Sequence, residues 1–329
     1  MFKIVQYSIV LLLLCVSCAK QQQSSTVNSQ LSTFSADSAY TYIAQQLAFG
    51  ARVPGTEAHE NCGDWLVNEL ARHGAQVKCQ HGTMINYAGK PQTLRNIDAI
   101  LEGNTSHAIL LCAHWDCRPW SDEEEAYEKR FEPVMGANDG ASGVGVILEI
   151  VRQLTIRKSK GEFVPTVQVV FFDCEDMGTP AHFTGSQRDH TWCLGSQYWA
   201  QQFNLQNSKF KIQYGVLLDM VGDPSATFPK EYFSKQYAGG YVEQLWRTAQ
   251  HLGYGRYFVQ QTTYYPITDD HYYVNTIAGI PCVDIIDYKM NTETGFAEWW
   301  HTQHDDIQNI NKQTLQAVGE TVLTTICSK

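Results

Sequence analysis

Seven acidic and imidazole side chains are the residues of this sequence best suited to chemistry. They are His114, Asp139, Glu175, Asp176, Asp219, Asp269 and His301. Carboxylate oxygens and imidazole nitrogens, without thiolates, are typical of a catalytic zinc site that keeps an open position, whereas closed structural sites usually contain cysteines. The set therefore predicts a catalytic metal centre whose ligands come from several loops.

Two adjacent carboxylates, Glu175 and Asp176, directly follow an apolar run that ends in Phe171-Phe172. Two such charges repel each other unless a cation neutralises one of them or a proton stays on the other. One carboxylate can then bind a metal ion while its neighbour acts as a general acid and base near neutral pH.

Several of these residues, and two segments near them in the sequence, also have an ordinary structural explanation. His114 could be a hydrogen-bonded histidine at a strand end, Asp139 lies beside glycine as turn and cap residues do, and Asp269 could cap a helix. Trp299-Trp300 could belong to the core, and the acidic cluster 122–125 is most simply a solvated loop. Capping does not explain, however, why every such loop follows a strand end or why His301 arrives with two tryptophans.

The elements that must position these residues alternate between two patterns. Short apolar, partly β-branched runs at 96–101, 108–113, 166–172, 214–220 and 280–286 predict strands buried on both faces. Helical patterns occupy 36–49, 57–72, 142–154, 196–203, 241–252, 271–277 and 312–326. This order predicts one α/β domain, a three-layer α/β/α sandwich with a mostly parallel, mixed central sheet.

The candidate residues lie just past the ends of the predicted strands. His114 and Asp116 follow the second run, Glu175 follows the third, Asp219 closes the fourth and Asp287 ends the fifth. In open α/β sheets the site forms outside the carboxyl ends of the strands, so we expect these loops to converge.

The first 18 residues resemble an export signal, with Lys3, an apolar run at 9–16 and Ser17 before Cys18. The run is too short for a membrane span of about 20 residues. Ser17-Cys18 resembles the lipobox of bacterial lipoproteins, which implies acylation of Cys18 and an exported, cell-envelope protein in the periplasm or at the outer membrane. A plain secretory signal is the alternative. Residues 19–35, rich in Gln, Ser and Thr, predict a flexible tether, and residues 36–329 a single catalytic domain.

Composition excludes some classes of partner. A formal net charge of −10 and the lack of a basic stripe argue against nucleic acid. Of the 10 cysteines, those outside the leader permit disulfides without assigning them, and none shows zinc-finger spacing. We expect contact with the membrane through the lipid anchor only, and a monomer, although nothing in the sequence sets the oligomeric state.

Five segments, in this order, resemble the zinc-dependent aminopeptidase-like superfamily, the M28 peptidases. They are Ala113-His114-Trp115-Asp116, Gly136-Ala137-Asn138-Asp139-Gly140-Ala141-Ser142-Gly143, Phe171-Phe172-Asp173-Cys174-Glu175-Asp176, Leu217-Leu218-Asp219-Met220-Val221-Gly222 and Trp300-His301-Thr302. The resemblance covers residues 36 to 328, and the segment 52–56 also looks like the entry to this group's first long helix. Because five ordered motifs match, the resemblance is far more specific than any one of them.

In the two-zinc aminopeptidases of this group, the matching positions imply five metal ligands, with Asp139 bridging and Glu175 as general base. The ligands would be His114, Asp139, Asp176, Asp219 and His301. The animal glutaminyl cyclases keep the scaffold with one zinc, which here implies Asp139, Asp176 and His301 as ligands. Glu175 then matches the proton shuttle, and Asp219, Asp269 and Trp300 match pocket residues.

Two features favour the cyclases. One is the run Asp269-Asp270-His271, and the other is the pair of aspartates at 305–306 shortly after Trp300-His301-Thr302. The resemblance then implies a glutaminyl-peptide cyclotransferase, which converts the N-terminal Gln of exported chains to pyroglutamate and releases ammonia. The alternatives are a two-zinc aminopeptidase and a surface lipoprotein that only binds peptides.

Three departures from the family pattern are visible. Asp176 stands where both groups usually carry glutamate, Asp284 stands where animal cyclases carry histidine, and Val144 replaces one partner of their cysteine pair.

Overall fold

The computed structural model describes residues 34–203 and 209–328, which excludes the expected signal, Cys18 and most of the expected tether. Six strands form the central sheet in the order β1-β2-β4-β3-β5-β8. Their bounds are β1 Gln76–Ile85, β2 Pro91–Leu101, β3 His107–His114, β4 Thr166–Phe172, β5 Lys211–Asp219 and β8 Cys282–Ile286. Strands β4, β3, β5 and β8 run parallel to one another, β2 pairs antiparallel with β4, and β1 pairs antiparallel with β2 at the edge of the sheet. The predicted mixed, mostly parallel sheet is confirmed.

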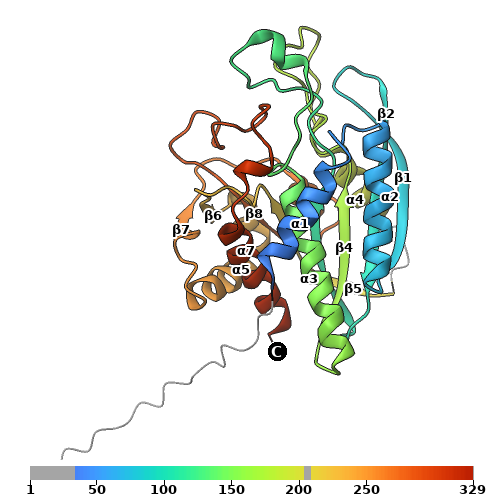
Figure 1. Ribbon diagram of the computed structural model, residues 1–329, viewed down its shortest axis with the longest axis vertical. Coiled ribbons are helices and arrows are strands. Elements are labelled where there is room, and N and C mark those ends of the chain that lie inside the picture. The colour runs from blue at the N-terminus through green and yellow to red at the C-terminus, as the bar shows by residue number, and fades with distance from the viewer. Residues whose placement is uncertain (1–33, 204–208, 329) are drawn as a thin grey trace, which may run out of the picture. The chain divides into compact units, whose positions relative to one another are not determined.

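Helices cover both faces of this sheet, as the three-layer prediction requires. The helices are α1 Ala36–Leu47, α2 Glu57–Arg72, α3 Ala141–Ser159, α4 Leu194–Phe203, α5 Tyr232–His251, α6 Asp270–Thr276 and α7 Lys312–Cys327. One core joins one face of the sheet to α1, α2, α3, α5 and α7, and a second core joins the other face to α4 and α6. Figure 1 shows α1, α3 and α7 in front of the strands. Two short strands, β6 Phe228–Lys230 and β7 Phe258–Thr262, form a separate two-stranded sheet.

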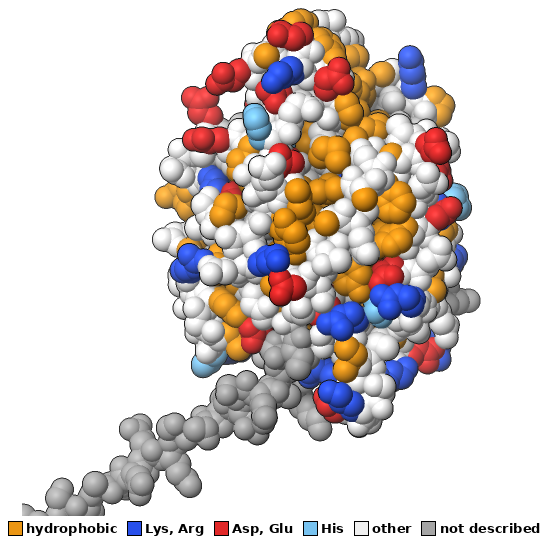
Figure 2. Space-filling view, viewed as in Figure 1, with side chains coloured by type: hydrophobic (Ala, Val, Ile, Leu, Met, Phe, Trp, Pro, Cys, Tyr) orange, Lys and Arg blue, Asp and Glu red, His pale blue; other side chains and the backbone are white. Residues whose placement is uncertain are grey.

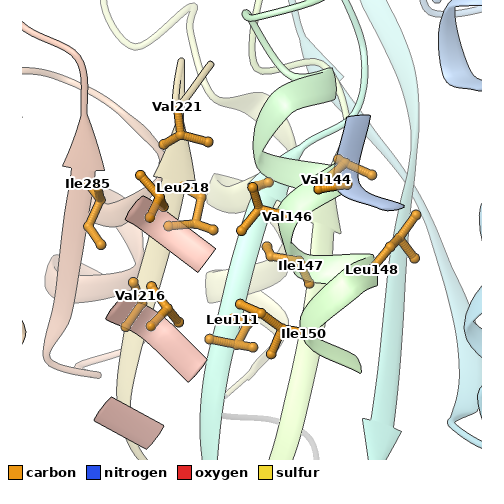
Figure 3. Packing of buried hydrophobic residues seen from close by; sticks show 14 of the residues in the cluster. Leu111, Val144, Val146, Ile147, Leu148, Ile150, Val216, Leu218, Val221 and Ile285 are labelled. Carbon is orange, nitrogen blue, oxygen red and sulfur yellow. The ribbon is translucent and has the colours of Figure 1, made fainter. Parts of the chain in front are cut away.

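The alternation of side chains along the buried strands divides the core between the two faces. Leu111, Val216 and Leu218 belong to the same buried cluster as Ile147 and Ile150 of α3, and Leu111 lies beside Ile147 and Ile150 (Figure 3). Their neighbours in the chain, including Cys112 and Leu217, point into the opposite core. Strands buried on both faces read as continuous apolar runs, which is why the sequence pattern identified them.

Helix α3 lies unusually close to β5 at its amino end. A Cβ atom added to Gly143 would lie 2.1 Å from the carbonyl oxygen of Leu218, so only glycine permits this approach. The contact places the loop before α3, which carries Asp139, beside the end of β5, which carries Asp219.

The main departures from the predicted elements have local causes. Helix α5 begins at Tyr232 rather than at residue 241, because Glu231 caps it by accepting hydrogen bonds from the backbone of Phe233 and Ser234. A non-helical residue, Ala238, then interrupts its periodicity just before a Gly-Gly pair. Strand β1 was not predicted because its side chains are exposed or half-buried, so it lacks an apolar run.

Two further features concern the surface. No helix in the described parts of the chain is long and apolar enough to cross a membrane. Acidic, basic and apolar side chains are interspersed on the face seen in Figure 2. The described residues all belong to one compact unit.

Candidate metal centre and active site

The parallel strands end together at one edge of the sheet and bring the predicted residues there. His114 is the last residue of β3 and pairs in register with Phe172, which ends β4, while Asp219 ends β5 and pairs with Ile286 of β8. Asp139 lies in the loop before α3, Asp269 caps α6, and His301 lies in the loop after β8. The expected convergence at the carboxyl ends of the strands is therefore what the structure shows.

Asp139, Asp176 and His301 form a buried set whose ligand atoms all lie within 4.8 Å of one another. The Nε2 atom of His301 is 3.2 Å from Oδ1 of Asp176 and 3.5 Å from Oδ2 of Asp139. Ligands of a tetrahedral zinc ion, with bonds of about 2.0–2.2 Å, stand about 3.3–3.6 Å apart. The spacing of this set therefore suits a zinc ion.

His114 forms a second set on the other side of Asp139. Its Nε2 atom is 2.9 Å from Oδ1 of Asp139 and 3.2 Å from Oδ1 of Asp219. Asp139 thus offers one carboxylate oxygen to each histidine. The two sets, which share Asp139, could hold either one or two cations.

The electrostatic field at this point favours a cation. Burial lowers the pKa of His114, but hydrogen bonds to Asp116, Asp139 and Asp219 outweigh it and raise the pKa well above its usual value. The nearby guanidinium of Arg118 bonds Asp122 and the backbone oxygen of Asp176, so it does not bind the carboxylates of the set. The site holds more buried carboxylates than positively charged groups, and a divalent cation stabilises such a site.

Glu175 lies beside this set without belonging to the group of Asp139, Asp176 and His301. Burial, and next the charge of Asp176, raise the pKa of Glu175 well above its usual value. The carboxylate of Asp116 accepts hydrogen bonds from the backbone N–H groups of Glu175 and Asp176, at 3.1 Å and 3.3 Å. A buried carboxyl with a raised pKa, held rigidly next to a metal set, is suited to proton transfer near neutral pH.

A cavity of about 830 Å³ opens above these groups. Its lining includes the charged and imidazole groups of Asp139, Glu175, Asp176, Asp219 and His301, and also Trp192, Ile267, Asp269, Tyr273, Phe296 and Trp300. The indole of Trp300 stacks on the ring of His301, with centroids 3.5 Å apart. Both Trp299 and Trp300 are partly exposed, so the alternative that they belong to the core is wrong.

A family model matches most of the chain. The model of Peptidase family M28 matches residues 96–326, which include all seven candidate residues. The chain belongs to peptidase family M28.

Solved structures extend the likeness to 91% of the M28 chain. A glutaminyl cyclase of Tannerella forsythia is 46% identical and covers 91% of this chain and 100% of its own, with a TM-score of 0.85. A Zn-dependent exopeptidase of Parabacteroides distasonis is 45% identical over the same shares, also with a TM-score of 0.85.

Among curated proteins, the bovine glutaminyl-peptide cyclotransferase is 23% identical over 253 residues, which are 70% of this chain and 64% of the bovine protein. Aminopeptidase YwaD of Bacillus subtilis is 27% identical over 236 residues, which are 70% of this chain and 44% of that protein. The M28 chain thus matches less than two thirds of the length of either relative.

One expectation about the surroundings of the M28 metal set is wrong. The acidic cluster at 122–125 is not simply a solvated loop, because Asp122 and Glu124 are buried. Asp122 pairs with Arg118, and its Oδ1 lies 3.6 Å from Nδ1 of His301. A carboxylate beside a ligating imidazole restricts the orientation of the ring. The loop that carries His301 folds over this segment, a contact that neither segment reveals alone.

Sequence reasoning also missed Trp192 and Cys193. The ring of Trp192 lies parallel to that of His301, with centroids 6.0 Å apart. The guanidinium of Arg118 lies over the Trp192 ring, 4.6 Å from its centroid. The segment 190–193 carries no apolar periodicity or glycine motif that would mark it. Residues 190–192 line the pocket because of the packing of the loop after Asp176.

Asp284, one of the departures from the family pattern, lies behind Asp269 rather than in the cavity. It is fully buried, with Oδ2 at 3.5 Å from Nδ1 of His271, whose Nε2 is 2.9 Å from Glu231. Burial, and next the charge of Asp269, raise the pKa of Asp284 well above its usual value. The eight cysteines of the described residues are all free, so the cysteine pair of the animal enzymes has no counterpart there.

Proposed function

We propose that this M28 chain is a zinc-dependent glutaminyl-peptide cyclotransferase, which converts the N-terminal Gln of exported peptides and proteins to pyroglutamate and releases ammonia. The observation that carries the proposal is the buried carboxyl of Glu175 between the set Asp139–Asp176–His301 and a pocket that Asp269 and Trp300 line. The likeness to bacterial and animal glutaminyl cyclases supports the same reaction.

The donor set of Asp139, Asp176 and His301 fits one Zn²⁺. Bound there, zinc supplies Lewis-acid polarisation of the side-chain carboxamide of the substrate. Asp219 and His114 remain outside this set in the one-zinc arrangement. Asp219 then holds the imidazole of His114 through its contact with Nε2.

The residues of the chain supply orientation and proton transfer. The α-amine of the substrate attacks its own γ-carbonyl carbon, the new C–N bond closes a five-membered ring, and the bond to the amide nitrogen breaks. Glu175 accepts the proton from the amine and returns it to the departing ammonia, which typically contributes about 10²–10⁴-fold in rate. Asp269 accepts a hydrogen bond from the amide nitrogen. Trp300 forms an apolar wall that holds the substrate in the reactive geometry, which in favourable cases lowers a barrier by about 7–11 kcal/mol.

A second function, the two-zinc aminopeptidase, is favoured by one observation. His114, Asp139 and Asp219 form a buried second donor set that shares Asp139 with the first. The likeness to aminopeptidase YwaD supports this alternative as well. A third alternative is a lipoprotein that binds peptides without catalysis. The complete donor sets speak against it, because peptide binding alone does not require a metal site.

The reaction test compares Gln-initiated with Leu-initiated peptides on one sample whose zinc content is counted. We expect ammonia and a pyroglutamyl product from the Gln peptide, no free amino acid from the Leu peptide, and one zinc per chain. Hydrolysis of the Leu peptide with two zinc ions per chain would establish the aminopeptidase instead. A purified protein that binds no zinc and turns over neither peptide would leave only peptide binding.

We further propose that Cys18 is acylated and anchors the enzyme to the cell envelope, where its substrates are other exported chains. Ser17-Cys18 after the apolar run 9–16 supports this. In bacteria grown with labelled palmitate, the wild type and Cys15→Ala should incorporate the label, whereas Cys18→Ala should not. An unlabelled wild-type protein released in soluble form would show a plain secretory signal.

A further inference from the structure

The thiol of Cys193 lies against the side chain of Glu175. Its Sγ atom is 3.1 Å from Oε1 of Glu175, and both residues are buried. The ligand atoms of Glu175, Cys193 and Asp269 all lie within 4.8 Å of one another. The thiol therefore lies next to both residues that are proposed to exchange protons or hydrogen bonds with the substrate.

The backbone of Cys193 is attached to the same segment. Its N–H group donates to the carbonyl oxygen of Glu175 at 2.9 Å, and the next residue, Leu194, donates to the carbonyl oxygen of Cys174 at 3.1 Å. The start of α4 is thus tied directly to the Glu175 segment. These bonds hold the thiol and the carboxylate in a fixed relation.

The backbone of Cys193 is strained. Its φ of 56° lies in the left-handed region, where glycine is the unstrained residue. A non-glycine residue in this region is strained and persists when the surrounding structure requires it. Glycine would relieve the strain but would remove the contact with Glu175.

The thiol is the donor in this contact. Burial, and next the charge of Glu175, raise the pKa of Cys193 well above its usual value, so the sulfur keeps its proton. A protonated thiol can donate, and a carboxylate oxygen accepts.

We propose that Cys193 is a positioning residue for proton transfer: its S–H group donates to Oε1 of Glu175, fixes the plane of the carboxylate and leaves Oε2 to take and return the proton of the substrate. The inference rests on the proposed role of Glu175 in cyclisation. The bond restricts rotation of the carboxyl group, so that a single oxygen serves both proton transfers. Its effect belongs to the chemical step, because Cys193 holds neither the metal set nor the pocket wall.

The test measures kcat, KM and zinc content of the zinc-loaded enzyme on a Gln-initiated peptide. We expect Cys193→Ala to lower kcat about 10-fold, within the range that general acid–base catalysis supplies, with KM changed less than about two-fold and zinc unchanged. Cys193→Ser keeps a donor and should recover kcat to within about three-fold of the wild type. Cys62→Ala removes an equally buried thiol from α2, away from the cavity, and should leave kcat unchanged.

Two results would overturn the inference: an unchanged kcat in Cys193→Ala, or a Cys193→Ser enzyme no faster than Cys193→Ala. Serine keeps a hydrogen-bond donor that alanine lacks. Equal rates for the two variants would therefore mean that the thiol only fills space. If Cys193→Ala fails to fold, Cys193→Ser is compared with the wild type instead. A loss of kcat greater than about ten-fold in Cys193→Ser, at an unchanged melting temperature, would then contradict the inference. A wild-type enzyme that does not cyclise Gln peptides would refute the proposed function instead.

Discussion

Glu175→Gln should lower turnover of a Gln-initiated peptide by about 10²–10⁴-fold while the zinc content stays unchanged. The amide has nearly the same volume as the carboxyl but cannot take up and return a proton. Glu175 also lies outside the set Asp139–Asp176–His301, so the metal ligands remain. Ammonia release and metal content, measured on the same sample, check both parts of the result.

The matched control for this change is Glu149→Gln. Glu149 is a fully buried glutamate in α3, where it bonds Arg152 and Gln153 and lies away from the cavity lining. This variant should lose stability and keep kcat. Turnover of Glu175→Gln close to the wild-type rate would contradict the assigned role of Glu175, and a lost zinc ion would make Glu175 part of the metal site.

His301→Ala should abolish both zinc binding and turnover, because it removes the imidazole that faces Asp139 and Asp176 in the metal set. The remaining carboxylates keep their charge but lose the nitrogen ligand that completes the group. A ligand present at about 100 times its Kd stabilises the folded state by about 2.7 kcal/mol. Added zinc should therefore raise the melting temperature of chelator-treated wild type and leave that of His301→Ala unchanged.

His304→Ala is the matched control for the metal prediction. His304 is exposed, lies three residues further along the same loop and belongs to none of the donor sets among the described residues. It should bind zinc and turn over substrate like the wild type. Stoichiometric zinc in His301→Ala would contradict the ligand set and would point to the second set, around His114, as the main metal site.

The sequence by itself determined which residues could meet. Strands buried on both faces read as uninterrupted apolar runs, and a polar residue directly after such a run must lie at the sheet edge. His114, Glu175 and Asp219 were located in this way, since each is tied by the chain to the end of its own strand. The family motifs added Asp139 and His301, whose loops have no apolar pattern of their own.

Only the tertiary structure decided which groups surround them. Asp122, Trp192 and Cys193 reach the site because loops far apart in the chain pack on one another, and such contacts leave no periodic trace in the sequence. Burial also depends on this packing, as the change of 122–125 from an expected solvated loop to a buried ion pair shows. Short-range patterns report the faces of single elements, whereas the chemistry of a side chain depends on neighbours that only the folded chain supplies.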